Sequence, residues 1–318
     1  MSALSDKIRI EWKENDAKRD AGLTTPEDVV RFDDLSYGPY EKWNVLDVYR
    51  PKGVEGKLPV IVSVHGGGWV YGDKELYQFY CMSLAQRGFA VVNFTYRLAP
   101  EYQYPAPLED TNRVIEWMYE NKEKYGFDME NVFMVGDSAG GHLAGLYGVI
   151  CTNPEYAERF AFKVPGNFVP KGLGLNCGAY VPIDTDTIKK AELLMPEMAV
   201  EESEKKDEVN SEEPDTDGDL MYDFLTGHGT IEEAEEICVP MHITSAYPPV
   251  FLMTAVGDFC KVHVPPMEAA LKEHKVSYIY KEYGNEKNPL YHVFHVTIQD
   301  EDGQKCNDEQ CAFFKSLM

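Results

Sequence analysis

The segment Gly136-Asp137-Ser138-Ala139-Gly140-Gly141 constrains the fold of this 318-residue chain more than any other. It contains the pattern G-x-S-x-G and follows the apolar run 131–135, which is typical of a buried strand. Residues 142–151 then have the pattern of a helix. A strand, a sharp turn and a helix in this order present a serine at the end of the strand. The glycines are needed because a side chain beside the serine would collide with the strand or the helix.

A second glycine-rich segment, His65-Gly66-Gly67-Gly68-Trp69, follows the apolar run 59–64. Its glycines leave backbone N–H groups uncovered, and such donors stabilise the negative oxygen that forms when an acyl carbonyl is attacked. Removal of one donor typically costs about 2.7–4 kcal/mol of barrier stabilisation. Alone, the segment is equally well explained as a simple turn. Together with Ser138 it predicts an oxyanion-binding loop.

Apolar runs alternate with helical patterns along most of the chain, which predicts a mainly parallel sheet covered by helices on both faces. Ligands bind beyond the carboxyl ends of strands in such sheets, and both glycine-rich segments lie there. We expect strands at 45–50, 59–64, 89–96, 131–135, 171–177, 249–255 and 276–283, and helices at 74–87, 107–124, 142–151, 265–274 and 307–317.

Two regions depart from this alternation within an expected single domain of residues 1–318. Residues 1–30 are charged with helical spacing, and we expect them to form a cap segment over the cleft. Residues 180–247 show no convincing strand and include eleven Asp or Glu residues against two Lys between Glu197 and Asp219. We expect this acidic insertion to form part of a cap or lid, with a solvated loop as the alternative.

Composition excludes several classes of function. The formal net charge of −24 argues against nucleic acid and against anionic membrane surfaces. No apolar run is long enough to span a membrane, and residues 1–9 lack the apolar core of a secretory signal. The seven cysteines are odd in number and scattered without metal-site spacing, so we expect reduced, buried thiols and no metal. Reduced cysteines favour a cytoplasmic location. No dinucleotide fingerprint is present, so no cofactor is expected; the sequence does not indicate an oligomeric state.

A serine nucleophile needs a histidine base and an orienting carboxylate, in the chain order Ser, acid, His in this architecture. Asp258 follows the strong strand 249–255 and is the candidate acid, with Asp184 and Asp186 as alternatives. His292 and His295 both lie after the last strand, and spacing alone does not choose between them. We interpret His142 as a packed histidine. We interpret three further candidates as surface or cap histidines: His228, His242 and His263.

The sequence resembles the hormone-sensitive-lipase-like branch of the α/β-hydrolases, the bacterial carboxylesterases, from about residue 40 to about residue 317. His65–Trp69 matches the H-G-G-G-W of this branch, and Gly136–Gly141 matches its G-D-S-A-G-G. Tyr96–Glu101 and Pro105–Asp110 are similar to its Y-R-L-A-P-E and P-x-x-L-E-D stretches. The resemblance implies an α/β-hydrolase fold with a cap from the N-terminus and an insertion.

The same resemblance implies roles for individual residues. Ser138 would be the nucleophile, and Gly67, Gly68 and Ala139 would supply the N–H groups of the oxyanion hole. The branch places its histidine in H-x-F, which His292-Val293-Phe294 matches and His295 does not. Its acid usually stands in D-P-L, whereas this chain has Asp258-Phe259-Cys260.

The expected function is that of a serine carboxylesterase acting on small-molecule esters with short acyl chains, through an acyl-enzyme intermediate. The acyl preference rests on the family resemblance alone. Alternatives on the same fold are an amidase, a lactonase, or a sugar-ester deacylase that removes acetyl or feruloyl groups. An alternative of another class is a binding protein without turnover. The presence of both Ser138 and a late histidine argues against that alternative.

Overall fold

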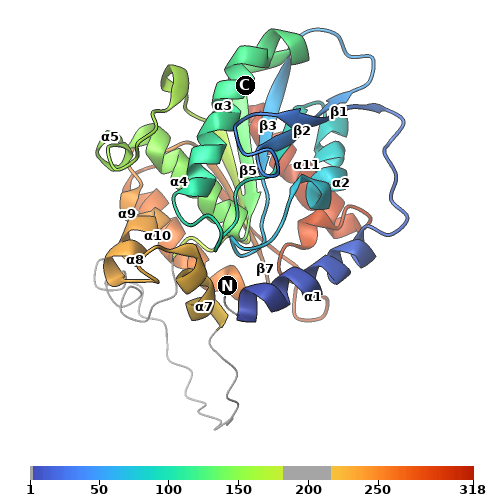
Figure 1. The fold of residues 1–318 in the computed structure, drawn as a ribbon. Helices are drawn as coiled ribbons and strands as arrows, with labels where there is room; N and C mark the ends of the chain where they lie inside the picture. The colour runs from blue at the N-terminus through green and yellow to red at the C-terminus, as the bar shows by residue number, and fades with distance from the viewer. Residues whose placement is uncertain (1–2, 182–215) are drawn as a thin grey trace.

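The computed structural model describes residues 3–181 and 216–318, and an eight-stranded sheet forms its centre (Figure 1). The strand order is β1-β2-β4-β3-β5-β6-β7-β8, and all neighbours from β4 to β8 are parallel. β1 and β2 pair antiparallel at one edge, and β2 pairs antiparallel with β4. The strands are β1 (Val29–Ser36), β2 (Val45–Pro51), β3 (Leu58–Val64), β4 (Ala90–Phe94), β5 (Phe127–Asp137), β6 (Gly172–Asn176), β7 (Val250–Ala255) and β8 (Tyr278–Tyr283).

Helices cover both faces of the sheet. The main ones are α1 (Ala3–Arg19), α2 (Lys74–Gln86), α3 (Ala106–Tyr125), α4 (Ala139–Thr152), α7 (Thr216–Phe224), α10 (Val264–Glu273) and α11 (Glu301–Ser316). Shorter ones are α5 (Pro154–Ala157), α8 (Ile231–Ile237), α9 (Val239–His242), and the 3₁₀ turns η1 (Pro165–Asn167), η2 (Phe259–His263) and η3 (Phe294–Val296). No helix among the described residues is both long and apolar enough to cross a bilayer.

The two-residue period of the strands builds two hydrophobic layers. In β3, Val60 and Val62 pack in the layer that contains α3, α4 and α10, whereas Ile61 packs with α2 and α11. In the second layer the rings of Phe133 and Phe314 stack with centroids 4.6 Å apart. Both faces of the central strands are therefore buried, as the continuous apolar runs predict for a parallel sheet.

Helix α1 lies at the carboxyl edge of the sheet and contacts α7 (Figure 1). Ser5 in α1 donates a hydrogen bond to Asp223 in α7. Arg9 donates to the backbone carbonyls of Val70 and Ala99, at 2.8 Å each, and pairs with Glu101 at 2.6 Å. These contacts hold α1 against the loops that follow β3 and β4.

Some boundaries differ from the sequence expectations. Strand β1 was not expected, because the charged residues in VVRFDDLS hide the apolar pattern, and its position at the sheet edge tolerates them. Helix α11 begins at Glu301 rather than near 307, because Gly303 weakens the helical pattern of its first turn. Residues 182–215 of the expected insertion, including Asp184 and Asp186, lie outside the described residues, and its described part folds as α7, α8 and α9.

Candidate active site

Ser138 occupies the sharp turn between β5 and α4, with φ 52° and ψ −123°. A non-glycine residue in this region is strained, and such strain is held only where the surroundings force it. The flanking glycines show what forces it. A Cβ atom at Gly136 would lie 2.2 Å from the carbonyl oxygen of Gly140, and one at Gly140 would lie 2.1 Å from that of Val64. Strand and helix thus approach so closely that only glycine fits beside the serine.

The loop after β3 brings the second glycine-rich segment to the same place. Gly67 has φ +121°, and a Cβ atom there would lie 2.0 Å from the carbonyl oxygen of Tyr71. The N–H of Gly66 donates to the Tyr77 hydroxyl at 3.0 Å. Within the described parts of the chain, the N–H groups of Gly67, Gly68 and Ala139 have no protein acceptor. These three donors therefore remain free to bind an oxyanion.

His65, the first residue of this loop, is held in place by contacts with Tyr96. Its ring stacks on Tyr96 at 4.0 Å, and the Tyr96 hydroxyl donates to the His65 carbonyl at 2.9 Å. Burial lowers the pKa of His65 to about 4, so the ring is neutral at neutral pH. His65 is therefore a structural part of the loop rather than a proton carrier.

The stretches 96–101 and 105–110, which carried part of the resemblance, bind each other. Arg97 forms a salt bridge with Asp110 at 2.9 Å and with Glu109 at 2.6 Å, and the Arg97 backbone N–H also donates to Asp110. Both Arg97 and Asp110 are buried. The pair fixes the backbone that follows Tyr96, and thus the support under His65.

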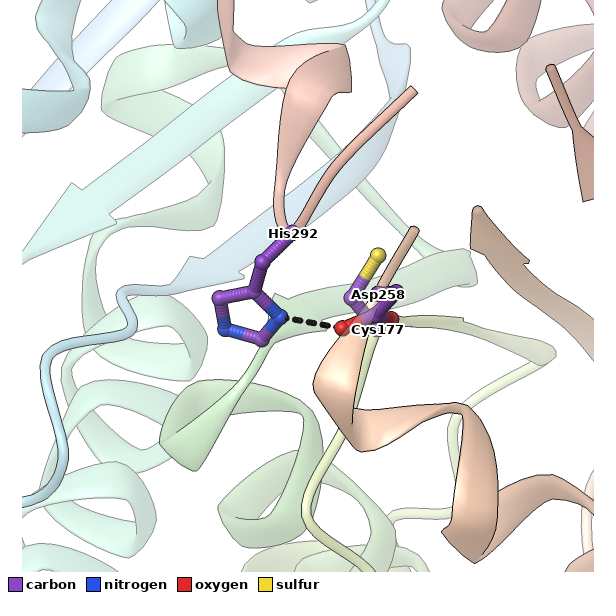
Figure 2. A group of neighbouring side chains, drawn as sticks. All are labelled: Cys177, Asp258 and His292. Atoms are coloured by element: carbon purple, nitrogen blue, oxygen red, sulfur yellow. Dashed lines mark hydrogen bonds and ion pairs between the residues drawn. The ribbon is translucent and has the colours of Figure 1, made fainter. Parts of the chain in front are cut away.

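The structure brings Asp258 and His292 together. His292 Nδ1 lies 2.6 Å from Asp258 Oδ1 (Figure 2). Asp258 also accepts hydrogen bonds from the Thr254 hydroxyl at 2.7 Å and from the Cys260 N–H at 2.9 Å. The carboxylate is thus held on several sides, and one of its oxygens orients the imidazole.

Opposing effects set the pKa of Asp258. Burial raises it, but the hydrogen bond and charge interaction with His292, together with the Thr254 hydroxyl, hold it below its ordinary value. Asp258 is therefore ionised at neutral pH, as a residue must be that stabilises an imidazolium.

Other histidines lie elsewhere. His295 is fully buried, its Nε2 lies 3.3 Å from the Asn176 amide nitrogen, and burial lowers its pKa to about 3. His142 accepts from the Trp69 indole N–H at 3.2 Å and is buried, which confirms the interpretation of a packed residue. His263 is only 3% exposed, whereas we expected a surface or cap position. Its apolar neighbour Val264, which is also buried, was the available signal.

Cys177 lies beside the pair, and its sulfur, an Asp258 oxygen and a His292 nitrogen are all within 4.8 Å of one another (Figure 2). Such a trio suggests a metal centre, but its chemistry does not fit one. Burial raises the pKa of the Cys177 thiol well above its ordinary value, whereas a metal binds the thiolate. His292 Nδ1 already faces Asp258. We interpret the trio as internal support for the carboxylate.

Two cavities adjoin at Ser138, because Ser138, Trp12 and Phe259 line both. The first has a volume of about 470 Å³ and includes Gly68, Ala139 and His263 in its walls. The second has a volume of about 380 Å³ and includes Gly67 and His292. The serine, the histidine and the glycine-rich loop thus face one continuous space.

A strand–serine–helix turn at the carboxyl edge of a mostly parallel eight-stranded sheet defines the α/β-hydrolase fold. The chain belongs to the BD-FAE family, whose model matches residues 46–258. The expected fold class and the resemblance to hormone-sensitive-lipase-like hydrolases are both confirmed.

Solved structures match nearly the full length of the chain. Esterase B from Lactobacillus rhamnosis, inhibited by a C6-C4 SN3 compound, superposes with a TM-score of 0.82 at 26% identity and covers 99% of this chain and 97% of that one. The hyperthermophilic esterase from Pyrobaculum calidifontis gives a TM-score of 0.73 at 24% identity, covering 98% and 93% of the two chains. This second likeness shows the fold.

Curated relatives match over shorter stretches. Versiconal hemiacetal acetate esterase of Dothistroma septosporum is 41% identical over 98 residues, which is 30% of each chain. Carboxylesterase NlhH of Mycobacterium tuberculosis is 36% identical over 125 residues, 39% of this chain and 37% of that protein. The matched stretches thus span about a third of these relatives' length.

Proposed function

We propose that this protein is a serine carboxylesterase that hydrolyses short-chain acyl esters of small molecules. The observation that carries the proposal is the strained Ser138 turn, which shares a cavity with a His292 already hydrogen-bonded to Asp258. The names of the relatives and of the solved structures support it, because they are esterases and carboxylesterases.

In this mechanism Ser138 Oγ attacks the ester carbonyl and His292 accepts its proton. The N–H groups of Gly67, Gly68 and Ala139 bind the oxyanion, where preorganised donors stabilise developing charge most strongly. His292 then donates the proton to the leaving alcohol, while Asp258 holds the imidazole in the correct tautomer. Water activated by His292 releases the acid and regenerates Ser138.

The cap is part of the proposal. Helices α1 and α7 lie over the serine, and both contribute residues to the larger cavity: Leu4, Ile8, Leu220 and Met221. We assign a cap role to residues 1–30 and to the described part of 180–247, because they exclude water from the serine. The number and scattered spacing of the seven cysteines favour the cytoplasm as the place of action.

The test is hydrolysis of p-nitrophenyl butyrate by the Ser138→Ala variant. We expect loss of measurable activity with an unchanged far-UV spectrum, because alanine removes the nucleophile alone. Ser277→Ala is the matched control, since Ser277 is an exposed serine outside both cavities. Full activity in Ser138→Ala would overturn the proposal and assign the hydrolysis to another nucleophile, whereas no activity in the wild-type protein would leave the binding-protein alternative.

A further inference from the structure

The two cavities at Ser138 differ in chemistry. The larger has walls that are mostly apolar, with Lys7, Glu11 and His263 as the polar exceptions away from the serine. The smaller also exposes more apolar than polar surface, but more polar side chains line it, and we call it the polar cavity. Besides Ser138, these side chains are Asn15, Asp16, Arg19, Tyr71, Tyr77, Asp137 and His292. An ester split between these cavities therefore places one half beside few polar side chains and the other beside many.

The reaction decides which half enters which cavity. The alcohol oxygen must come within hydrogen-bond reach of the histidine that protonates it as it leaves. Among the two cavities, His292 and Gly67 line only the polar one, whereas Gly68 and Ala139 line only the apolar one. The alcohol half of the ester thus extends into the polar cavity, and the acyl chain extends into the apolar one.

The polar wall is rich in hydrogen-bond acceptors. Asp16 Oδ1 accepts from Arg19 at 2.7 Å, and Asp16 Oδ2 accepts from the Tyr71 hydroxyl at 2.9 Å. An ionised carboxylate offers about four acceptor positions, so Asp16 keeps capacity for further donors. Arg19 is occupied by Asp16, by Asp20 and by the carbonyl of Leu76. Such a wall suits a group that donates hydrogen bonds and disfavours an anion.

Aromatic rings frame the same space. Trp12 and Tyr71 pack edge to face with centroids 6.0 Å apart, and Phe259 lies over His292 with centroids 4.1 Å apart. A carboxylate between aromatic rings can bind hydroxyl groups while the rings contact the carbon atoms of the same ligand. This combination favours a hydroxylated carbon chain or ring over a plain alkyl group.

We infer that the polar cavity is the alcohol subsite and that Asp16, assisted by Tyr71, selects esters whose alcohol half carries additional hydroxyl groups. The inference rests on the proposed esterase function. Asp16 is a specificity residue in this scheme, because it contacts the alcohol half and not the reacting carbonyl. The cavity of about 380 Å³ admits open-chain or cyclic polyols.

The test compares kcat/KM for glyceryl 1-monobutyrate and propyl butyrate, which share an acyl group and differ by two hydroxyls. We expect the full-length protein to prefer the glyceryl ester at least tenfold, and Asp16→Asn to lower this ratio about tenfold, since hydrogen bonds to charged groups are among the stronger ones. Tyr71→Phe should lower it as well, and carries the test if Asp16→Asn does not fold. Glu14→Gln is the control, because Glu14 is exposed on the same helix and lines neither cavity.

A second pair, a 6-O-butyryl hexose and cyclohexylmethyl butyrate, distinguishes a cyclic from an open-chain polyol. Preference for the hydroxylated member of either pair, reduced in Asp16→Asn, supports the inference. Equal rates within both pairs, or an equal loss on both members in Asp16→Asn, would overturn the subsite while Ser138-dependent hydrolysis of propyl butyrate still upheld the esterase. Absence of hydrolysis of all four esters would instead count against the proposed function.

Discussion

At the scale of single residues, Asp137 connects the serine turn to the oxyanion loop. Its carboxylate accepts a hydrogen bond from the Tyr77 hydroxyl at 2.6 Å, and that hydroxyl accepts from the Gly66 N–H. Burial raises the pKa of Asp137 from 3.8 to about 6, although the Tyr77 hydroxyl opposes the rise. A carboxyl group that ionises with difficulty thus lies next to the nucleophile. It lowers the stability of the fold but holds the Tyr77 hydroxyl that binds the oxyanion loop.

Asp137→Asn is expected to stabilise the fold in a pH-dependent way. Because the folded-state pKa is raised, Asp137 does not lower the free energy of unfolding below about pH 4, where it is protonated in both states. As the pH rises through about 6, ionisation of the buried carboxyl group lowers the free energy of unfolding by its full amount, and the Asn variant avoids this loss. A shift of about two units corresponds to roughly 3 kcal/mol. Denaturant unfolding should therefore show a gain of about 3 kcal/mol at pH 7.5 and about 1 kcal/mol at pH 4.5. A gain that does not vary with pH would contradict this account.

The site residues show how far sequence reasoning reaches. The backbone turns at Ser138 and Gly67 were predictable, because a strained turn and a crowded loop need glycines and these glycines lie close together in the sequence. The choice of His292 over His295 needed either the family pattern or the fold, because a three-residue separation has no fixed meaning in a loop. The Asp16–Tyr71 contact joins residues far apart in the chain, and no local pattern signals it.

At the scale of secondary-structure elements, we expect the loop after β3 to tolerate little change, because a Cβ atom at Gly67 would lie 2.0 Å from the Tyr71 carbonyl oxygen. Gly67→Ala should lower kcat/KM for p-nitrophenyl butyrate by roughly a hundredfold or more, because a Cβ atom would meet the Tyr71 carbonyl and displace the oxyanion donors. Gly53→Ala is the matched control. Gly53 also has a positive φ of +76°, but nothing lies within 4 Å of a Cβ atom there.

Similar activity in Gly67→Ala and wild type would exclude the loop from the oxyanion hole. An equal loss in Gly53→Ala would assign the effect to general backbone strain rather than to the site.

The sequence also predicts some secondary-structure elements better than others. Central strands were predictable because both faces are buried and their runs are continuous, whereas β1 was not, since an edge strand carries charges that a central one cannot.

At the scale of the whole molecule, the net charge of −24 sets the field that a substrate meets on approach. Long-range repulsion lowers the local concentration of anions and is screened by salt, with a Debye length of about 10 Å at 0.1 M. For p-carboxyphenyl butyrate, kcat/KM should rise several-fold between about 10 and 300 mM NaCl. For the neutral p-nitrophenyl butyrate it should change little. Parallel salt responses of the two esters would show that the molecular field does not reach the site.

The layered α/β fold was predictable in outline because continuous apolar runs alternate with helical patterns along most of the chain. The position of α1 over the serine was not predictable. Arg9 holds α1 there by donating hydrogen bonds to the backbone carbonyls of Val70 and Ala99, and every residue has a carbonyl, so no sequence pattern indicates these partners. The two cavities therefore emerge only when the N-terminal helix and the loops after β3 and β4 are seen together.

The most direct test of the central claim is the site of reaction with a fluorophosphonate probe, mapped by mass spectrometry of the intact protein and its peptides. An activated serine reacts, whereas ordinary serines do not. We predict one adduct, on Ser138, that is absent in Ser138→Ala, forms far more slowly in His292→Ala, and is unchanged in Ser277→Ala. An adduct on another residue, or labelling of Ser138 at the wild-type rate without His292, would contradict the account.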